Sequence, residues 1–181
     1  MINWKLVQEF KPALLFVGKF VILYIGLNLI YGAYVNSFES GPDLITKWVT
    51  NQTSILLNSI GEITYTQPDN IIANQYIFRG ENTILAVYEG CNGVNTMIVF
   101  ISFLLAYGRF SKKLFWFIPI GVIIIHLFNL VRIGALYFVV IYLQDYLYFT
   151  HKYLFTAFLF AVIFLLWIIW VQKLYPRENE K

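Results

Sequence analysis

Cysteine, histidine and charged residues are scarce in this sequence. Its 181 residues include one cysteine, Cys91, and two histidines, and only 13% of them are charged. A single thiol forms no intramolecular disulfide and supplies no cysteine-based metal site. The sequence also lacks HExxH, GxGxxG and P-loop patterns and any basic, aromatic-rich patch for nucleic acid. It therefore predicts no metal, no cofactor and no nucleic-acid partner.

Hydrophobic residues are abundant, at 59% of the chain, and aromatic residues make up 19%. This composition is too apolar for a soluble domain of this length and is typical of an integral membrane protein. We expect an all-α integral membrane fold, a polytopic helical bundle in which residues 1–181 form a single membrane domain.

A helix needs about 20 apolar residues to cross a hydrocarbon core of about 30 Å. Four stretches of the sequence reach or approach this length. We predict spans at about 13–35, 92–107, 114–138 and 153–172. The first is too long for a signal peptide and lacks a cleavage site, so we interpret it as a retained helix. The third stretch stays apolar to residue 143, and two interpretations remain open: one long helix, or a break near Asn129 that adds a fifth span.

Basic residues indicate the orientation of these spans. They cluster before the first span, between the second and third, and after the fourth, at Lys5, Lys11, Arg109, Lys112, Lys113, Lys173, Arg177 and Lys181. With four crossings these clusters share one side, which the positive-inside rule places in the cytoplasm together with both termini. We therefore predict a multi-pass protein of the cell inner membrane, with segment 36–91 and Cys91 on its outer, periplasmic face.

The outer segment 36–91 has secondary-structure patterns of its own. Residues 42–58 have apolar side chains at helical spacing and predict an amphipathic helix on the membrane surface. Three short runs rich in β-branched and aromatic residues predict strands at 62–66, 71–78 and 83–88.

Polar residues within predicted spans are costly and mark functional sites by default. One stripe at helical spacing follows the third span through His126, Asn129 and Arg132, and another follows the second span through Cys91, Asn95 and Ser102. We expect both stripes to face the bundle interior. His151 lies just before the fourth span, so the topology predicts that Cys91, Arg132 and His151 converge at the outer membrane face.

These residue types form a coherent catalytic set. We expect the start of the second span and nearby cations to lower the pKa of Cys91, the nucleophile, with Asn92 capping the helix and Gly93 leaving room for a substrate backbone. His151 is the candidate general base and acid. Arg132 is the candidate donor to a developing oxyanion or to a substrate carbonyl.

Other interpretations stay open at this point. A free cysteine can be a small apolar side chain, and an arginine near a helix end can anchor the helix at the interface. The chain would then be a non-enzymatic membrane assembly or transport subunit, with its polar residues serving helix packing. A third possibility is a binding module for a lipid-linked polysaccharide, in which Arg132 holds phosphate.

The motifs Glu-Gly-Cys91-Asn-Gly-Val and Asn129-Leu-Val-Arg132-Ile, followed by His151, resemble the exosortase/archaeosortase family. The similarity covers about residues 88–155, and the short chain and the Cys-Asn-Gly form resemble the exosortase F group of Bacteroidota. Two departures are the Asn at position 92, where many members have Ser or Ala, and fewer spans than in larger members.

The resemblance implies a membrane-embedded cysteine protease/transpeptidase. Its clients carry a C-terminal tail made of a short motif, one transmembrane helix and a basic cluster, and the enzyme cuts near the motif and passes the new C-terminus to a cell-surface acceptor. It implies Cys91 as nucleophile, Arg132 as the oxyanion or substrate-orienting residue and His151 as acid/base. The small number of spans implies an accessory membrane protein for client recruitment.

Overall fold

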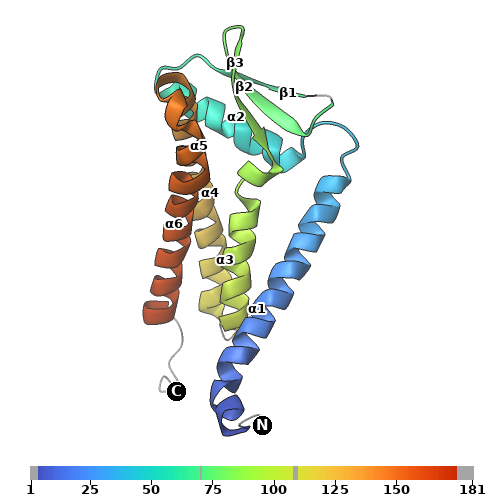
Figure 1. Ribbon diagram of the computed structural model, residues 1–181, viewed down its shortest axis with the longest axis vertical. Coiled ribbons are helices and arrows are strands. Elements are labelled where there is room, and N and C mark those ends of the chain that lie inside the picture. The colour runs from blue at the N-terminus through green and yellow to red at the C-terminus, as the bar shows by residue number, and fades with distance from the viewer. Residues whose placement is uncertain (1–3, 70, 108–109, 175–181) are drawn as a thin grey trace.

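The computed structural model describes residues 4–69, 71–107 and 110–174, and most of these residues are helical. Four helices run along the long axis of the molecule, α1 (Trp4–Asn36), α3 (Val94–Tyr107), α4 (Lys112–Tyr142) and α6 (Phe155–Ile169) (Figure 1). Helix α2 (Leu44–Ser59), a three-stranded sheet and the short helix α5 (Leu147–Phe149) gather at one end. The predicted fold class, a mainly helical membrane protein, is confirmed, and segment 36–91 contains short strands as expected.

Three helical stretches are long and apolar enough to cross a membrane, Phe10–Asn36, Lys112–Tyr142 and Gln144–Leu174. They overlap the predicted spans at 13–35, 114–138 and 153–172, and the chain is a multi-pass membrane protein. Helix α3, in the predicted span 92–107, has 14 residues. It is therefore about 21 Å long, shorter than a hydrocarbon core of about 30 Å. That α3 makes a fourth crossing stays a prediction.

Helix α4 continues without interruption through Asn129, so the interpretation with a break near this residue is wrong. Ser111 caps the helix by accepting a hydrogen bond of 3.2 Å from the Leu114 amide. A helix of 31 residues is about 46 Å long. It therefore extends beyond a membrane core of about 30 Å, and its last turns reach the end of the molecule that carries α2 and the sheet.

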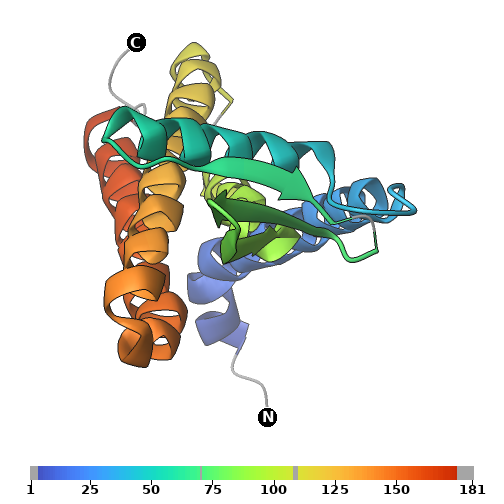
Figure 2. The same cartoon turned by 90° about the horizontal axis from the view of Figure 1, so that it is seen from above.

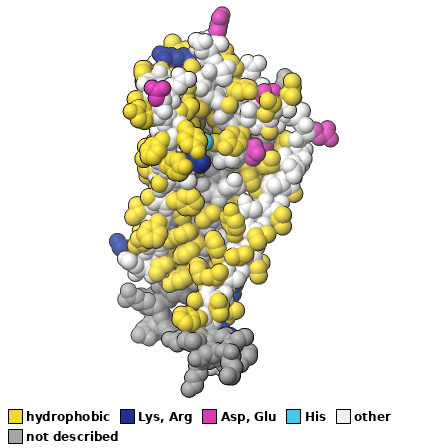
Figure 3. Space-filling model, in the orientation of Figure 1, with side chains coloured by type: hydrophobic (Ala, Val, Ile, Leu, Met, Phe, Trp, Pro, Cys, Tyr) yellow, Lys and Arg dark blue, Asp and Glu magenta, His cyan; other side chains and the backbone are white. Residues whose placement is uncertain are grey.

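The start of α1 and the C-terminal end of α6 lie at the same end of the bundle, opposite the sheet (Figure 1). The start of α4, which carries Lys112 and Lys113, is also at this end. Arg109, Arg177, Lys181 and the side chain of Lys5 lie outside the described residues. Figure 3 shows hydrophobic side chains over the visible helices and acidic side chains at the end with the sheet. Which end faces the cytoplasm stays a prediction.

Helix α2 lies across the ends of the bundle helices, with the sheet alongside it (Figure 2). Asp43 caps it, because one carboxylate oxygen accepts from the amides of Ile45 at 2.9 Å and Thr46 at 3.1 Å. Its buried face is rich in hydroxyl groups: Thr46, Val49, Thr50, Thr53, Ser54 and Leu57. The hydroxyls of Thr50 and Thr53 donate to backbone carbonyls one turn earlier, and that of Thr46 donates to the Asp43 carboxylate, so all three are satisfied inside the protein.

The expected apolar stripe of α2 is therefore only partly buried. Leu44, Trp48 and Ile55 are more than half exposed, with 62%, 55% and 68% of their surface accessible. An exposed apolar face on a helix that lies across the bundle end is what an interfacial helix presents to lipid headgroups. The helix itself is confirmed, and its contact with the membrane surface stays a prediction.

The sheet is antiparallel, with strands β1 (Tyr65–Pro68), β2 (Asn74–Arg79) and β3 (Asn82–Tyr88) in that order across it. All three predicted strands exist, and the first two begin three residues later than expected. Before the first strand, Glu62 and Thr64 hydrogen-bond to neighbouring helices instead of pairing with a strand. Gly80, with φ +59°, allows the tight turn between β2 and β3.

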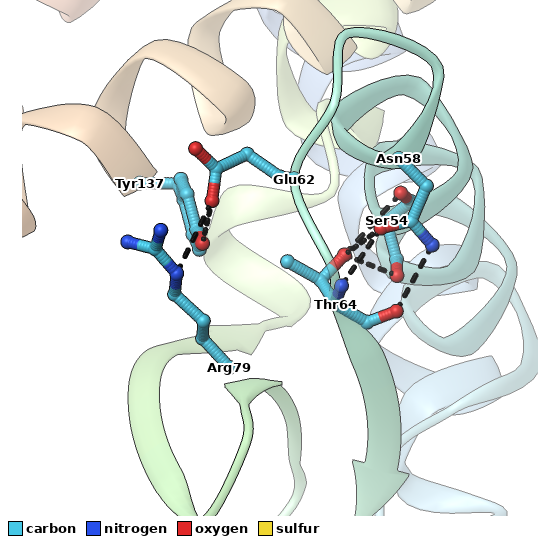
Figure 4. Close-up of polar contacts among 6 residues, drawn as sticks. All are labelled: Ser54, Asn58, Glu62, Thr64, Arg79 and Tyr137. Carbon is cyan, nitrogen blue, oxygen red and sulfur yellow. Dashed lines mark hydrogen bonds and ion pairs between the residues drawn. The ribbon is translucent and has the colours of Figure 1, made fainter.

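Two polar clusters attach the sheet to the helices (Figure 4). In the first, the Glu62 carboxylate accepts from the Tyr137 hydroxyl of α4 at 2.8 Å and pairs with Arg79 of β2 at 3.4 Å. In the second, Thr64 hydrogen-bonds with the side chains of Ser54 and Asn58 on α2. The chain just before β1 is thus tied to both α2 and α4.

Buried side chains form two apolar clusters. The first joins α3, α4 and α6 and the turn after α6 through Phe100, Leu104, Leu114, Phe117, Ile125, Val162, Ile163, Leu166 and Trp170. The second joins α2, the sheet and the last part of α4 through Val49, Leu57, Ile77, Val87, Cys91, Leu130, Ile133 and Tyr137. Cys91 therefore belongs to the cluster at the sheet end of the molecule.

Candidate active site

Cys91 ends a single 3-10 turn, η1 (Glu89–Cys91), that connects β3 to α3. Two glycines shape this turn. A Cβ on Gly90 would lie 2.4 Å from a ring carbon of Tyr88, and Gly93 has φ +88° and would bring a Cβ to 3.0 Å from the Asn129 side chain. Since L side chains rarely adopt a φ of +88°, the turn depends on glycine at position 93, whereas a Cβ at position 90 would displace the Tyr88 ring.

Asn129 and Asn92 hold the turn from two sides. The Asn129 amide donates to the Cys91 carbonyl at 3.0 Å. Asn92 accepts from the Val94 amide at 3.0 Å, as expected for a residue that caps α3. Its own amide donates to the hydroxyls of Tyr31 at 2.7 Å and Thr46 at 3.0 Å. The turn is therefore bonded to α1, α2 and α4 through two fully buried asparagines.

His151 approaches Cys91 from the turn before α6. It lies in η3 (Thr150–Leu154), a π-helical turn, and its Nε2 atom is 3.7 Å from the Cys91 Sγ atom. This distance is within hydrogen-bonding range for sulfur, so a proton can pass between thiol and imidazole. The 60 residues that separate the two in sequence are bridged by packing of α4 against the last helix.

Arg132 brings a buried positive charge to the same place. Its residue is 9% exposed, and its Nη1 donates to Asn129 Oδ1 over a long 3.4 Å. Its Nε atom is buried and has no hydrogen-bond partner in the described part of the chain. Within that part, no carboxylate pairs with the guanidinium. A buried cation with a spare donor favours an incoming negatively charged oxygen.

The electrostatic environment of Cys91 differs from the sequence-based expectation. Burial raises the pKa of the Cys91 thiol above its ordinary value, although the Arg132 charge and hydrogen bonds from Tyr88 act in the opposite direction. The expected lowering of this pKa is therefore wrong, because desolvation of the thiolate outweighs these contacts. Cys91 also precedes α3 by three residues and so is not in the first turn of that helix.

All three residues line one cavity of about 370 Å³. Its walls come from β3, η1, α4 and the turns around α5, and apart from the three they are mostly apolar: Leu85, Ala86, Val87, Tyr88, Ile133, Leu136, Leu147 and Tyr148. The cavity therefore combines a thiol, an imidazole and a guanidinium with space for an apolar ligand.

Other residues of the predicted polar stripes lie elsewhere. His126 hydrogen-bonds with Gln52 at 2.6 Å and stacks on Trp48, both on α2. Asn95 is exposed, so its expected orientation toward the bundle interior is wrong. Ser102 is buried as expected but lies outside the cavity. Among the described residues, no group of three His, Cys, Asp or Glu side chains is placed to hold a metal.

Two tyrosines in the cavity were missed at the level of sequence. Tyr88 hydrogen-bonds with the Cys91 thiol through its side chain and its backbone. Tyr148 lies one helical turn before His151 and lines the same cavity. Tyr88 lies three residues before Cys91, and Tyr148 lies three residues before His151. This spacing was the sequence signal that could have identified them as cavity residues.

Comparisons with known proteins identify the family of this chain. Neither the curated proteins nor the solved structures include a match to this chain. The model of the family described as Transmembrane exosortase (Exosortase_EpsH) matches residues 6–171. This range holds the described helices almost completely and all of the cavity residues, and the chain therefore belongs to the transmembrane exosortase family.

Proposed function

We propose that this protein is a membrane-embedded cysteine endopeptidase/transpeptidase that removes the C-terminal sorting tail of surface-destined proteins. The contact of 3.7 Å between the Cys91 thiol and the His151 imidazole, in a cavity that Arg132 also lines, is the observation that carries the proposal. Family membership supports the same activity. The Cys-Asn-Gly form of the motif supports assignment to the exosortase F group of Bacteroidota.

The first half of the reaction forms a thioester. His151 Nε2 takes the thiol proton as Cys91 Sγ attacks the client carbonyl, which suits a thiol whose pKa is raised at rest. The carbonyl oxygen becomes an oxyanion, and the unpaired Nε–H of Arg132 donates to it. The His151 imidazolium then protonates the leaving nitrogen as the carbon–nitrogen bond breaks. The client's transmembrane tail departs with a new N-terminus.

The second half releases the client. An amine of a cell-envelope acceptor, or water, loses a proton to His151 and attacks the thioester carbonyl. The oxyanion forms again beside Arg132, and the thiolate leaves and takes the proton back from His151. An amine gives transfer to the acceptor, and water gives hydrolysis.

The proposed location is the cell inner membrane, with both termini in the cytoplasm and the cavity at the periplasmic face. The lysines at the ends of α4 and α6 opposite the sheet support this orientation. The proposed clients end in a short motif, one transmembrane helix and a basic cluster. An accessory membrane protein would assist their recruitment.

Processing of a reporter tests the proposal. The reporter carries the C-terminal tail of a protein from the same organism that has this motif, helix and basic cluster. Cys91→Ala should abolish cleavage, and His151→Ala should reduce it about a hundredfold or more, because acid–base catalysis supplies about 10²–10⁴. Asn95→Ala, an exposed polar position on α3, is the matched control and should cleave at the wild-type rate.

The rival functions give different results in the same assay. A non-enzymatic assembly or transport subunit would tolerate Cys91→Ser, and thiol reagents would leave its activity unchanged. A module that binds lipid-linked polysaccharide would need Arg132 but not Cys91. Wild-type processing by Cys91→Ala would refute the cysteine mechanism in either case.

A further inference from the structure

Strand β3 has one edge that pairs with no other strand. The sheet order is β1-β2-β3, so β2 occupies one side of β3 and its other side is an edge. In the described part of the chain, the residues of β3 before Tyr88 have no backbone hydrogen bonds outside the pairing with β2, and Tyr88 ends the strand as the N-cap residue of η1. An unpaired edge presents backbone donors and acceptors and is a template for a further strand.

The backbone groups on this edge follow from the register. Asn74 directs its N–H to Ile72 and its C=O to Asp69, away from β3. Its partner Tyr88 therefore forms a pair without mutual hydrogen bonds, and the backbone groups of Tyr88 point away from β2. The direction of the backbone N–H and C=O groups alternates along an antiparallel strand, so those of Ala86 also point away from β2. The Tyr88 backbone contact to the Cys91 thiol agrees with this direction.

The free edge forms one wall of the catalytic cavity. Four consecutive residues of β3, from Leu85 to Tyr88, line it. Successive side chains of a strand point to opposite faces of the sheet. Consecutive residues can therefore line one cavity only where the cavity lies along the edge of the strand. Leu147, Tyr148 and His151 line the cavity as well, and α4 contributes Ile133 and Leu136. The edge leads directly to Cys91, three residues after Tyr88.

We propose that the substrate binds as an extended apolar peptide strand added to the free edge of β3, with its backbone paired to Ala86. The inference rests on the function proposed above and names how that site holds its client. Ala86 is exposed at this edge, and an added strand supplies an N–H and a C=O to its backbone groups. The side chains of the strand occupy the apolar walls.

Strand addition also explains what the enzyme can cut. A carbonyl in a transmembrane helix already accepts a hydrogen bond from four residues ahead, and neighbouring side chains cover it. An extended segment leaves alternate carbonyls free, and pairing at Ala86 carries the chain toward the Cys91 sulfur. The cleaved bond therefore lies in the extended segment that precedes the client's helix, near the membrane boundary.

The test compares two reagents on the purified protein in detergent, where Cys91 is the sole thiol. Iodoacetamide reports the reactivity of the sulfur itself. An apolar tripeptidyl chloromethyl ketone adds an extended backbone, and analogues carry an N-methyl group on each backbone nitrogen in turn. We expect methylation at alternate nitrogens to slow alkylation by about tenfold, the cost of losing one hydrogen bond to the protein backbone.

Two variants complete the design. Ala86→Pro removes the outward N–H at a position where an edge strand tolerates proline, and Ala86→Ser keeps that N–H as the matched control. Relative to iodoacetamide, Ala86→Pro should react about tenfold more slowly with the peptidyl reagent than the wild type does, because the peptide carbonyl loses its N–H donor. Equal rates for all methylated analogues in the wild type would overturn strand addition, whatever the fate of the proline variant. The proposed function fails separately, through client processing by Cys91→Ala.

Discussion

Asn129 is the residue through which α4 controls the position of the nucleophile. It is fully buried, donates to the Cys91 carbonyl at 3.0 Å and accepts from Arg132 at 3.4 Å. Asn129→Leu keeps a similar volume but removes both bonds and leaves the Cys91 carbonyl without this partner. A buried polar group left unsatisfied costs about 1–3 kcal/mol. The bond to Arg132 is too long to add much to this figure.

Thermal unfolding in detergent measures the loss. For a chain of this length, about 1–3 kcal/mol corresponds to a Tm lower by about 2–12 °C. Reporter cleavage should fall as well, because the turn that holds Cys91 loses its attachment to α4. Asn95→Leu makes the same exchange at an exposed position and should stay within about 0.5 kcal/mol of the wild type. Equal Tm values for the two variants would refute the reasoning.

Two further predictions concern the thiol. Alkylation of Cys91 by iodoacetamide should rise with a midpoint above the ordinary thiol pKa, and Arg132→Gln should move it higher still, because the thiolate loses its stabilising charge. A downward shift would contradict the electrostatic account. Gly90→Ala places a Cβ 2.4 Å from the Tyr88 ring and must displace it. The pH midpoint of Cys91 alkylation should rise in Gly90→Ala, as it should in Tyr88→Phe. An unchanged midpoint in both variants would exclude the hydrogen bond from Tyr88 to the thiol.

Local patterns were sufficient for the elements of the fold. The apolar runs predicted the three long helices, and β-branched residues between Gly, Asn and Pro predicted the three strands. The first strand moved by three residues because Glu62 and Thr64 bond to helices rather than to a strand. The helical pattern at 42–58 predicted α2 but not its burial, since threonines whose hydroxyls bond to the backbone fill its inner face.

Polar spacing along a helix was a weaker guide to the site. Asn95 has helical spacing from Cys91, yet the chain turns at Gly93 before α3 begins, so the two do not share a face. His126 is two turns before Ile133 on α4 and faces α2 through Gln52 and Trp48 instead of the cavity. Residues at helical spacing share one face only where a single unbroken helix carries all of them.

Composition and periodicity were enough to predict a membrane protein and its helices and strands, because they act through local contacts and through the thickness of the bilayer. The motifs also indicated Cys91, Arg132 and His151 as candidates. The 3.7 Å contact between thiol and imidazole, the cavity that they share with Tyr88 and the edge of β3, and the raised pKa of the buried thiol became visible in the folded chain alone. Those properties depend on how α4, the sheet and the last helix pack together, and desolvation exists only once that packing excludes water.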